Sequence, residues 1–326
     1  MRILVLGGTR FIGRAIVEDL VGEGHEVTVV HRGETEPPDL PTVPHHHVDR
    51  HDPTGMREAV DGFRPDALVD TRALTAADAD AVLAVVPDGL RLAVLSSVDV
   101  YRAFGSVERE VETDPLPIDE RSPVRGEDHR YPYRGQRADL HDYEKLDVEP
   151  RYLDRGGVVF RLPMVYGEHD YQRREEFILR RVRAGRRRIP VGACSWLFCR
   201  GYVRDMATGV RLALESGAAD GEILNLAEAT TWSMGLWAKH ILDAAGWDAE
   251  LVQVPDPAVP DDLEETRTIR QHLLVSSQRA RELLGWVHSD PAEAVRRSVR
   301  WHLENPPPDQ SADFSADDRA LAAATG

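Results

Sequence analysis

The feature that most constrains this chain is its opening segment, MRILVLGGTRFIG. An apolar run at residues 3–6 passes directly into the glycine turn GGTRFIG, and an apolar segment at residues 15–20 follows at helical spacing. A strand, a glycine turn and a helix start in this order hold a dinucleotide pyrophosphate, because the helix N-terminus offers unpaired N–H groups and partial positive charge. The segment therefore predicts a dinucleotide-binding turn, with a ligand-free glycine turn as the alternative.

Glycine is expected at three positions of this turn for different reasons. Gly7 permits the tight turn, Gly8 lets the backbone approach the phosphates, and Gly13 lets helix and strand pack closely. Arg10 stands in place of the middle glycine of the standard fingerprint. We expect the cofactor to contact the whole turn: Gly7, Gly8, Thr9, Arg10, Phe11, Ile12 and Gly13.

The charge balance of the 326-residue chain narrows the classes of partner. The formal net charge is −16, which repels nucleic acid and anionic membranes unless basic residues cluster locally. No apolar run approaches the roughly 20 residues of a membrane helix, and the chain begins with a strand rather than a secretion signal. With Cys194 and Cys199 as its two cysteines, we expect free thiols and a cytoplasmic protein.

Short apolar runs alternate with helical patterns along most of the chain. This alternation predicts an α/β fold, a doubly wound parallel sheet (Rossmann) with a smaller, mainly C-terminal substrate domain. The expected boundaries are 1–166 and 201–232 for the NAD(P)-binding domain, 167–200 and 233–304 for the substrate domain, and 305–326 for a loose tail. The expected strands lie at 3–6, 26–30, 67–70, 92–95, 158–162 and 223–226.

Five later segments match, in order, the landmarks of one superfamily. They are LSSVDVY at 95–101, RLPMVYG at 161–167, RGYVRDMATGV at 200–210, GEILNLAE at 221–228 and ARELLGW at 280–286. With the glycine turn, the chain resembles the extended short-chain dehydrogenase/reductase superfamily, of the NAD(P)-dependent epimerase/dehydratase type. The GGTRFIG variant resembles an atypical branch and, within it, chloroplast stem-loop RNA-binding relatives.

The resemblance implies a catalytic Ser or Thr, a Tyr and a Lys. In the superfamily the serine hydroxyl bonds the substrate oxygen and the tyrosine is the acid/base. The lysine, four residues after the tyrosine, holds the nicotinamide ribose and lowers the pKa of the tyrosine. Ser97, four residues before Tyr101, matches the family serine; the alternative is an ordinary serine at a strand end.

The tyrosine and lysine positions depart from the family pattern in HDYEKLDVE, residues 141–149. Tyr143 and Lys145 are two residues apart, about 200° around a helix, and cannot share a helix face. If the segment is aligned on KLxxE, Lys145 is the ribose-binding lysine and His141 takes the tyrosine position, where its ordinary pKa suits proton transfer. If it is aligned on the tyrosine, Asp147 takes the lysine position.

We favour the alignment on KLxxE, and other acid/base groups stay open. Tyr143 is the alternative if the helix begins late and this residue lies on a loop. Tyr131 and Tyr133 are further candidates. A site that binds cofactor but has lost carbonyl chemistry is the remaining alternative.

The end of the second strand bears on the choice of dinucleotide. NAD-binding sites usually carry an acid there for the adenosine ribose, whereas this strand ends in His31 and Arg32, with no acid before Glu34. Arg32 and Arg10 can grip a 2′-phosphate by bidentate hydrogen bonds. We therefore expect NADP(H), with NAD(H) as the alternative. His31 is also expected to contact the cofactor, and by resemblance Asp49 lies near the adenine.

Four histidines near Asp49 raise the question of a metal site. They are His45, His46, His47 and His51. Because the run lies just before the aspartate expected near the adenine, we predict a surface loop and no metal.

Eight arginines stand within residues 173–188, beside two glutamates. We expect a basic helix at 175–184 and a loop at 185–200. Two interpretations are open: a solvated helix face paired with local acids, or an anion site for a nucleotide diphosphate, joined by Arg200 and Arg204. The eight are Arg173, Arg174, Arg180, Arg181, Arg183, Arg186, Arg187 and Arg188.

These observations predict an oxidoreductase, epimerase or dehydratase that acts on a sugar or sugar nucleotide through NAD(P)-dependent hydride transfer. The catalytic candidates are Ser97, His141, Tyr143 and Lys145. The alternative is a catalytically atypical dinucleotide-sensing or nucleic-acid-binding protein on the same fold, although the acidic charge argues against nucleic acid. The substrate, expected to be anionic, and a homodimeric assembly are left open.

Overall fold

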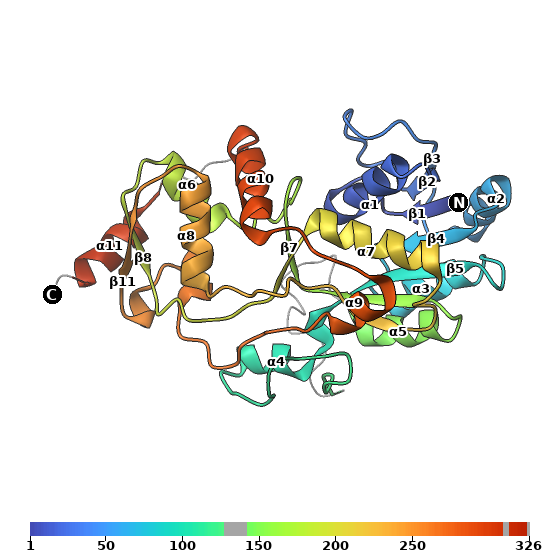
Figure 1. Cartoon of the computed structure of the whole chain (residues 1–326). Helices are drawn as coiled ribbons and strands as arrows, with labels where there is room; N and C mark the ends of the chain where they lie inside the picture. Colours follow the sequence, from blue (N-terminus) through green and yellow to red (C-terminus); the bar gives the residue numbers. More distant parts are fainter. Residues whose placement is uncertain (127–141, 309–312, 325–326) are drawn as a thin grey trace.

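A seven-stranded parallel sheet is the central element of the computed structural model, which describes residues 1–126, 142–308 and 313–324 (Figure 1). Every pair of neighbouring strands is parallel. The predicted doubly wound sheet is therefore confirmed. From one edge to the other the strands are Ile223–Asn225 (β10), Val158–Leu162 (β6), Arg91–Ser97 (β5), Ala67–Asp70 (β4), Arg2–Leu6 (β1), Glu26–His31 (β2) and His45–His47 (β3).

Helices cover both faces of this sheet (Figure 1). On one face α1 (Phe11–Gly22) packs against α7 (Val203–Ser216). On the other face lie α2 (Pro53–Phe63), α3 (Ala76–Leu83) and α5 (Lys145–Leu153). The strand order reverses at β1, since β2 and β4 lie on opposite sides of it. The carboxyl ends of β1 and β4 therefore border the crevice where such sheets bind ligands.

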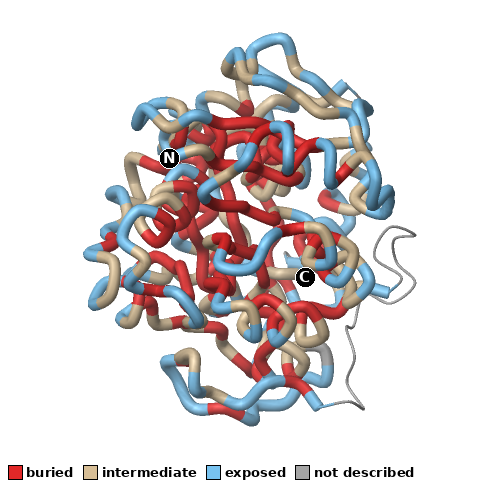
Figure 2. The backbone as a smooth tube through the Cα atoms, turned by 90° about the vertical axis from the view of Figure 1, so that its right-hand side faces the viewer, coloured by how far each residue is buried: buried red, intermediate tan, exposed pale blue. Residues whose placement is uncertain are grey.

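Alternation along each strand sorts its side chains onto the two faces. Ile3 and Val5 of β1 belong to the buried cluster on the α1 side, whereas Leu4 and Leu6 belong to the cluster on the α2 side. Successive side chains of a strand point to opposite faces, so the unbroken apolar run marks a strand buried on both sides. Figure 2 shows these buried segments in the interior and the exposed ones along the outer loops.

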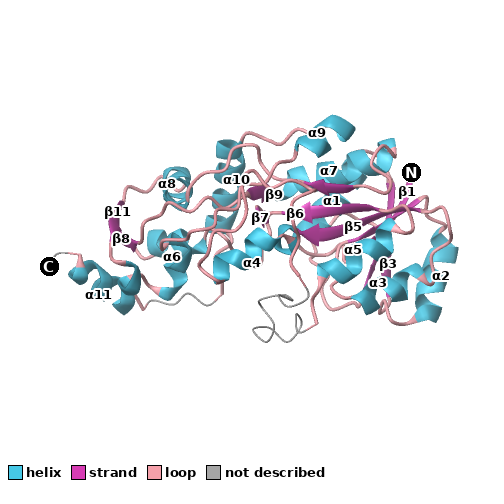
Figure 3. Cartoon of the chain, turned by 90° about the horizontal axis from the view of Figure 1, so that it is seen from below, coloured by secondary structure: helices cyan, strands magenta, loops and turns pink. Residues whose placement is uncertain are grey.

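A second region extends from the sheet toward the left of Figure 1 (compare Figure 3). The small sheet of β7 (Met164–Tyr166) and β9 (Arg200–Tyr202) lies between this region and the central sheet, and α4 (Arg102–Glu108) lies below. The elements of the second region are α6 (Glu176–Arg183), β8 (Arg188–Val191), α8 (Met234–Ala244), β11 (Glu250–Gln253), α10 (Pro291–Glu304) and α11 (Ser315–Ala323).

Two predictions of loops are wrong. Part of the expected loop at 185–200 forms β8, because a partner strand, β11, pairs with it in parallel from about sixty residues further along. The expected histidine loop is β3, a short edge strand paired with β2. In both cases the strand is stabilised by pairing with a separate segment of the chain, and the residues of the strand itself did not predict it.

The prediction of a loose tail is wrong for residues 315–323, which form α11. Asp317 of this helix is buried and bonds the buried guanidinium of Arg181 at 2.7 and 2.8 Å. Just before the helix, the Phe314 ring lies beneath the guanidinium groups of Arg180 and Arg186. Contacts with α6 and the residues that follow it therefore hold α11 in place.

The ARELLGW segment returns to the central sheet, although the expected boundaries put it in the substrate domain. Its helix, α9 (Gln278–Leu284), packs against α7 and β10. Trp286 is buried, and its indole N–H donates to the Asp205 carbonyl at 2.9 Å.

Two further expectations concern the cysteines and membrane spans. Cys194 and Cys199 are free thiols, as predicted. In the part of the chain that the structure describes, no helix is both long and apolar enough to cross a membrane.

Candidate functional site

The glycine turn lies at the carboxyl end of β1 and leads into α1. Arg10 is the N-cap residue, no side chain caps the helix, and its first turn holds no acidic residue. The first N–H groups of a helix have no partner within it, so this N-terminus can receive an anion. Arg10 is exposed beside it. These residues fit the pyrophosphate of a dinucleotide.

Close packing accounts for the glycines of the turn. Gly7 has a φ of +84°, which favours glycine. A Cβ on Gly13 would collide with the Gly7 carbonyl oxygen, and one on Gly8 would lie 2.7 Å from a methyl group of Val17 and 3.0 Å from one of Val29. The three glycines thus let α1 approach the ends of β1 and β2.

The predicted adenosine end of the cofactor site lies at the end of β2. The loop after this strand contacts the glycine turn, because the hydroxyls of Thr9 and Thr35 lie 3.1 Å apart. Arg32 is exposed and pairs with Glu34 at 2.9 Å. Asp49 is exposed as well. Arg32 and Asp49 are therefore accessible to a ligand at this end.

At the other end of the expected site, Ser97 and Asp99 follow one another at the end of β5. The Ser97 hydroxyl accepts the Asp99 N–H at 3.2 Å, which caps the 3-10 helix Val98–Val100. Asp99 is buried, and its Oδ2 accepts the Tyr143 hydroxyl at 3.0 Å. Its Oδ1 has no hydrogen-bond partner among the described atoms. Ser97 and Tyr143 are therefore linked through Asp99.

Lys145 is the first residue of α5, and Tyr143 precedes the helix on a loop. The lysine is buried; its Nζ donates to the carbonyl oxygens of Ala73 (2.5 Å) and Leu95 (2.8 Å) and lies 5.6 Å from the centroid of the Tyr143 ring. The two side chains approach one another because helical spacing does not apply before the helix begins. An ammonium has three N–H donors, so one is without a partner among the described residues.

Burial shifts the pKa of Asp99 and that of Lys145 toward neutrality. Desolvation raises the pKa of Asp99 to about 6, against the opposing effect of the Arg125 guanidinium. Desolvation also lowers the pKa of Lys145 to about 8, against the carboxylates of Asp70 and Asp99. Shifts of this kind, at the carboxyl ends of sheet strands, are typical of functional sites.

A buried ion pair holds α5 against the sheet behind this cluster. Glu149 accepts hydrogen bonds from Arg161 of β6 at 2.7 and 3.0 Å and from the Ser96 hydroxyl at 2.5 Å. Arg161 also lies over the ring of Tyr101, whose hydroxyl donates to Asn225. These contacts fix α5 relative to β5 and β6, and thereby the position of Lys145.

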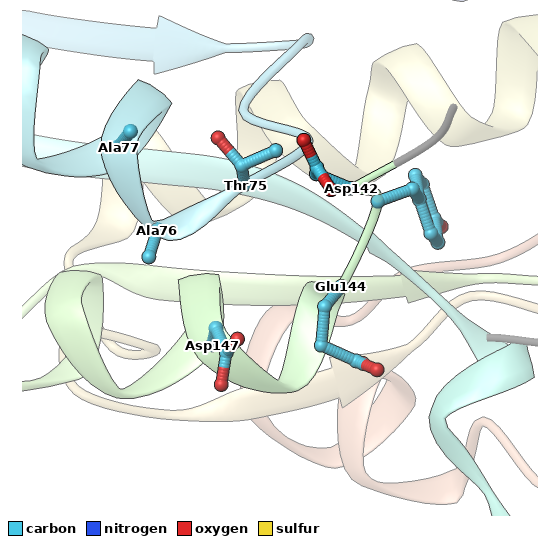
Figure 4. A pocket seen from close by; sticks show the side chains of 7 residues that line it. Thr75, Ala76, Ala77, Asp142, Glu144 and Asp147 are labelled. Carbon is cyan, nitrogen blue, oxygen red and sulfur yellow. The ribbon is translucent and has the colours of Figure 1, made fainter. Parts of the chain in front are cut away.

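A pocket of about 260 Å³ opens beside the cluster, between the N-terminal ends of α3 and α5 (Figure 4). Asp147, the alternative lysine position, lies on its wall, so the structure puts an acid there and the ammonium of Lys145 in the sheet crevice. The residues that line the pocket are Thr75, Ala76, Ala77, Asp142, Tyr143, Glu144 and Asp147.

Of the four catalytic candidates, the structure brings Ser97, Tyr143 and Lys145 together. His141 lies outside the described residues, as do Tyr131 and Tyr133, so their roles stay predictions. Asp99 was missed from the sequence. Its only signal was an acid between two valines, two residues after Ser97.

The arginines at residues 173–188 lie largely against acidic partners. Arg181 is buried between Asp262 and Asp317, with closest N–O distances of 2.8 and 2.7 Å. This arrangement favours the paired helix face over an anion site. Further pairs join Arg173 and Arg183 to Glu176, Arg180 to Asp262, Arg186 to Asp318 and Arg188 to Glu250, while Arg187 lies over Trp247.

The two arginines expected to join that anion site also have protein partners. Arg200 is buried over the ring of Trp237 and donates to the Trp232 carbonyl at 3.0 Å. Arg204 is exposed and pairs with Glu168 at 3.4 Å. The buried guanidinium of Arg200 therefore does not add to an open anion site, whereas Arg204 lies at the surface beside an acid.

Comparison with known proteins supports the site at the glycine turn. Residues 3–86 match the model of the NAD dependent epimerase/dehydratase family. A curated relative, the chloroplast stem-loop binding protein of 41 kDa b from Arabidopsis thaliana, is 26% identical and aligns with 98% of this chain and 84% of its own.

Two solved structures share the fold at low sequence identity. A putative epimerase from Burkholderia cenocepacia has a TM-score of 0.71 and 21% identity, covering 92% of this chain and 97% of its own. UDP-glucose 4-epimerase from Bifidobacterium longum, in complex with NAD+ and UDP, has a TM-score of 0.69 and 16% identity, covering 94% and 99%. The family match and the shared fold confirm that this chain resembles the extended short-chain dehydrogenase/reductase superfamily, of the NAD-dependent epimerase/dehydratase type.

Proposed function

We propose that this protein is an epimerase, dehydratase or reductase that acts on a sugar or sugar nucleotide with a bound nicotinamide dinucleotide. The observation that carries the proposal is the meeting of Ser97, Tyr143 and Lys145 at the carboxyl ends of β4 and β5, the same edge of the sheet at which the glycine turn follows β1. Similarity to a UDP-glucose 4-epimerase crystallised with NAD+ and UDP supports the substrate class.

The chain supplies the groups for proton transfer and for binding. The chemistry that the dinucleotide supplies when bound is hydride transfer at its nicotinamide ring. The Ser97 hydroxyl bonds the substrate oxygen, and Tyr143 takes up its proton as the phenolate or returns it from the hydroxyl. Asp99 fixes the Tyr143 hydroxyl at 3.0 Å, and Lys145 keeps one N–H donor for the nicotinamide ribose. His141 is the alternative acid/base.

The test is turnover of a panel of sugar nucleotides by the purified protein with NADP(H) or NAD(H). We expect Ser97→Ala and Lys145→Met to lower kcat by about 10²–10⁴-fold, because each removes a group that bonds reacting atoms or cofactor. Lys239→Met, at an exposed lysine of α8, is the matched control and should keep full turnover. Near-normal turnover of both site variants would reject this site.

For the cofactor we propose NADP(H), with NAD(H) as the alternative. Support comes from the exposed Arg32 and Arg10 at the end of β2 and in the glycine turn, and from the absence of an acid at the strand end. The related structure named above holds NAD+, which favours the alternative. Dissociation constants for NADPH and NADH distinguish the two, and a clear NADH preference would contradict the role of Arg32.

A second candidate function is binding of structured RNA without carbonyl chemistry. It is favoured by one observation, the match of 98% of this chain to a relative named as a stem-loop binding protein. The net charge of −16 and the pairing of the 173–188 arginines oppose it. Titration of a stem-loop RNA over a range of salt concentrations tests it, because phosphate contacts make affinity fall steeply with salt.

A further inference from the structure

Two histidines and a glutamate direct their donor atoms to one point at the edge of the sheet. His31 ends β2, His45 begins β3, and Glu36 comes from the loop that joins these strands. The Nε2 atom of His31 lies 2.8 Å from Nδ1 of His45 and 3.2 Å from Oε1 of Glu36, and the latter two atoms are 3.9 Å apart. Among the described residues, this is the one group of three or more such side chains with metal-ligand spacing.

The strand register explains why these side chains meet. β2 and β3 are parallel, with Val29 opposite His45 and His31 opposite His47. Side chains two apart along a strand share a face, as do residues opposite one another on paired strands. His31, His45 and His47 therefore lie on one face of the sheet, whereas His46 points to the other.

The donor separations, 2.8 to 3.9 Å, bracket those of a small tetrahedral metal site. Zinc bonds histidine nitrogen at about 2.0–2.1 Å and carboxylate oxygen at about 2.0–2.2 Å, which sets neighbouring ligand atoms about 3.3–3.5 Å apart. The three measured separations lie on both sides of that value. The side chain of His31 is 7% exposed and that of His45 21%, so one side of the site is already closed to water.

In place of the metal-free histidine loop and the cofactor contact of His31 expected from the sequence, we propose that His31, His45 and Glu36 form a site for a divalent transition metal of the zinc class. Two imidazoles and a carboxylate suit zinc, cobalt and nickel better than the oxygen-binding cations calcium and magnesium. The donors occupy three corners of a tetrahedron and leave the fourth open. His47, which is more exposed, contacts the same Glu36 oxygen through Nε2.

One backbone contact must change when the metal binds. The Gly33 N–H now donates to Nδ1 of His31 at 3.1 Å. A neutral imidazole that binds metal through Nε2 carries its proton on Nδ1 and usually donates it to an acceptor. The peptide between Arg32 and Gly33 therefore turns to present the Arg32 carbonyl. Glycine accommodates this rotation, since Gly33 is exposed and already has a φ of +78°.

Zinc alone, titrated into the metal-free full-length protein against a chromophoric chelator, tests the site without any dinucleotide. We expect one tight zinc per chain. His45→Ala and Glu36→Gln should each weaken zinc binding by at least about 10–100-fold, the range already reached when only an outer-shell partner is lost. Cobalt in place of zinc should give a visible absorption band for a low-coordinate site, and His45→Ala should abolish it.

His46→Ala is the matched control, because it shortens the same run of histidines without touching the site. Its zinc affinity should stay within about twofold of the parent, a change too small to reflect loss of a ligand. If His46→Ala weakens binding as much as His45→Ala, or if Glu36→Gln has no effect, the metal binds to the histidine run itself and the proposal is wrong. Far-ultraviolet circular dichroism of each metal-free variant verifies that it is folded.

Discussion

The arginines beside the glycine turn and those of the 173–188 stretch differ in what they contact. Arg10 is exposed with no ion-pair partner among the described residues, and Arg32 is 61% exposed beside a single glutamate. In contrast, Arg181 is fully buried between two aspartates. The denser run of positive charge is the one that the fold neutralises, so charge density in a sequence does not measure charge available to a ligand.

The cluster of Ser97, Asp99, Tyr143 and Lys145 at the strand ends also holds polar groups that lack a partner among the described residues. Asp99 Oδ1 is buried without a partner in the described part of the chain, and Lys145 has a spare N–H donor. Each unsatisfied buried group costs stability. This cost is expected where a bound ligand completes the hydrogen-bond network. We therefore expect variants of the glycine turn and of the cluster of Ser97, Asp99, Tyr143 and Lys145 to change mainly activity. Variants of the 173–188 arginines should change mainly stability.

The largest effect is expected at Tyr143. Tyr143→Phe removes the hydroxyl that bonds Asp99 and should lower kcat by about 10²–10⁴-fold through loss of acid/base catalysis. Because it also takes a hydrogen bond from the buried Asp99 carboxylate, the free energy of unfolding should fall by about 1–3 kcal/mol. Steady-state kinetics and urea unfolding measure the two quantities. Tyr171→Phe, at a half-exposed tyrosine, is the control. Unchanged kcat in Tyr143→Phe would transfer the acid/base role to another group such as His141.

Among the 173–188 arginines, Arg181→Met should destabilise the fold by about 3–5 kcal/mol, because it leaves the buried carboxylate of Asp317 without its cation. Urea unfolding measures this change. Arg188→Met removes an exposed pair with Glu250 and should cost no more than about 1 kcal/mol. If the two substitutions cost the same, the contrast between buried and open arginines fails.

A smaller effect is expected on cofactor affinity. Arg32→Ala should weaken NADPH binding by about 10–100-fold, since a charged hydrogen bond to a phosphate contributes about 1.5–3 kcal/mol, and should leave NADH binding nearly unchanged. Fluorescence titration measures both constants. Arg188→Ala is the matched control, because Arg188 also pairs with one glutamate at the surface. Equal losses for both dinucleotides would show that Arg32 does not read the 2′-phosphate.

The last two predictions concern pH. The pKa of Asp99 is raised to about 6, so its carboxylate is present above pH 6 and is lost as the pH falls through that value. A neutral carboxyl holds the Tyr143 hydroxyl less firmly, and kcat/KM should therefore decline below about pH 6. In Asp99→Asn, kcat/KM should not show this decline at low pH.

Stability should follow pH in the opposite direction. The folded pKa of Asp99 lies above the ordinary aspartate value of about 3.9, so the folded state binds more protons between the two values and stability falls as the pH rises. The penalty is absent below about pH 4, complete above about pH 6 and at most about 3 kcal/mol. Unfolding of Asp99→Asn at pH 4 and pH 7 measures it; no change in relative stability would contradict the raised pKa.

Much of the fold could be predicted because its signals are local. The strand at 3–6, the glycine turn and α1 are adjacent in sequence, and the repeated alternation of apolar runs and helices indicates a parallel sheet. The misses were the strands β3, β7, β8, β9 and β11 and the helix α11. The missed strands are only three or four residues long, and β3, β8 and α11 are each stabilised by a partner remote in sequence. Periodicity within such a segment carries no information about that partner.

By itself, the sequence determined the glycine turn between β1 and α1, the α/β fold and the fact that Tyr143 and Lys145 cannot share a helix face. Only the tertiary structure decided that they meet nevertheless, by starting α5 at Lys145, and that Asp99, 44 residues before Tyr143, lies between Ser97 and Tyr143. It also decided which arginines remain accessible to a ligand. The physical reason is that backbone propensity and periodicity act over a few residues, whereas strand order and register decide which distant side chains come within bonding distance.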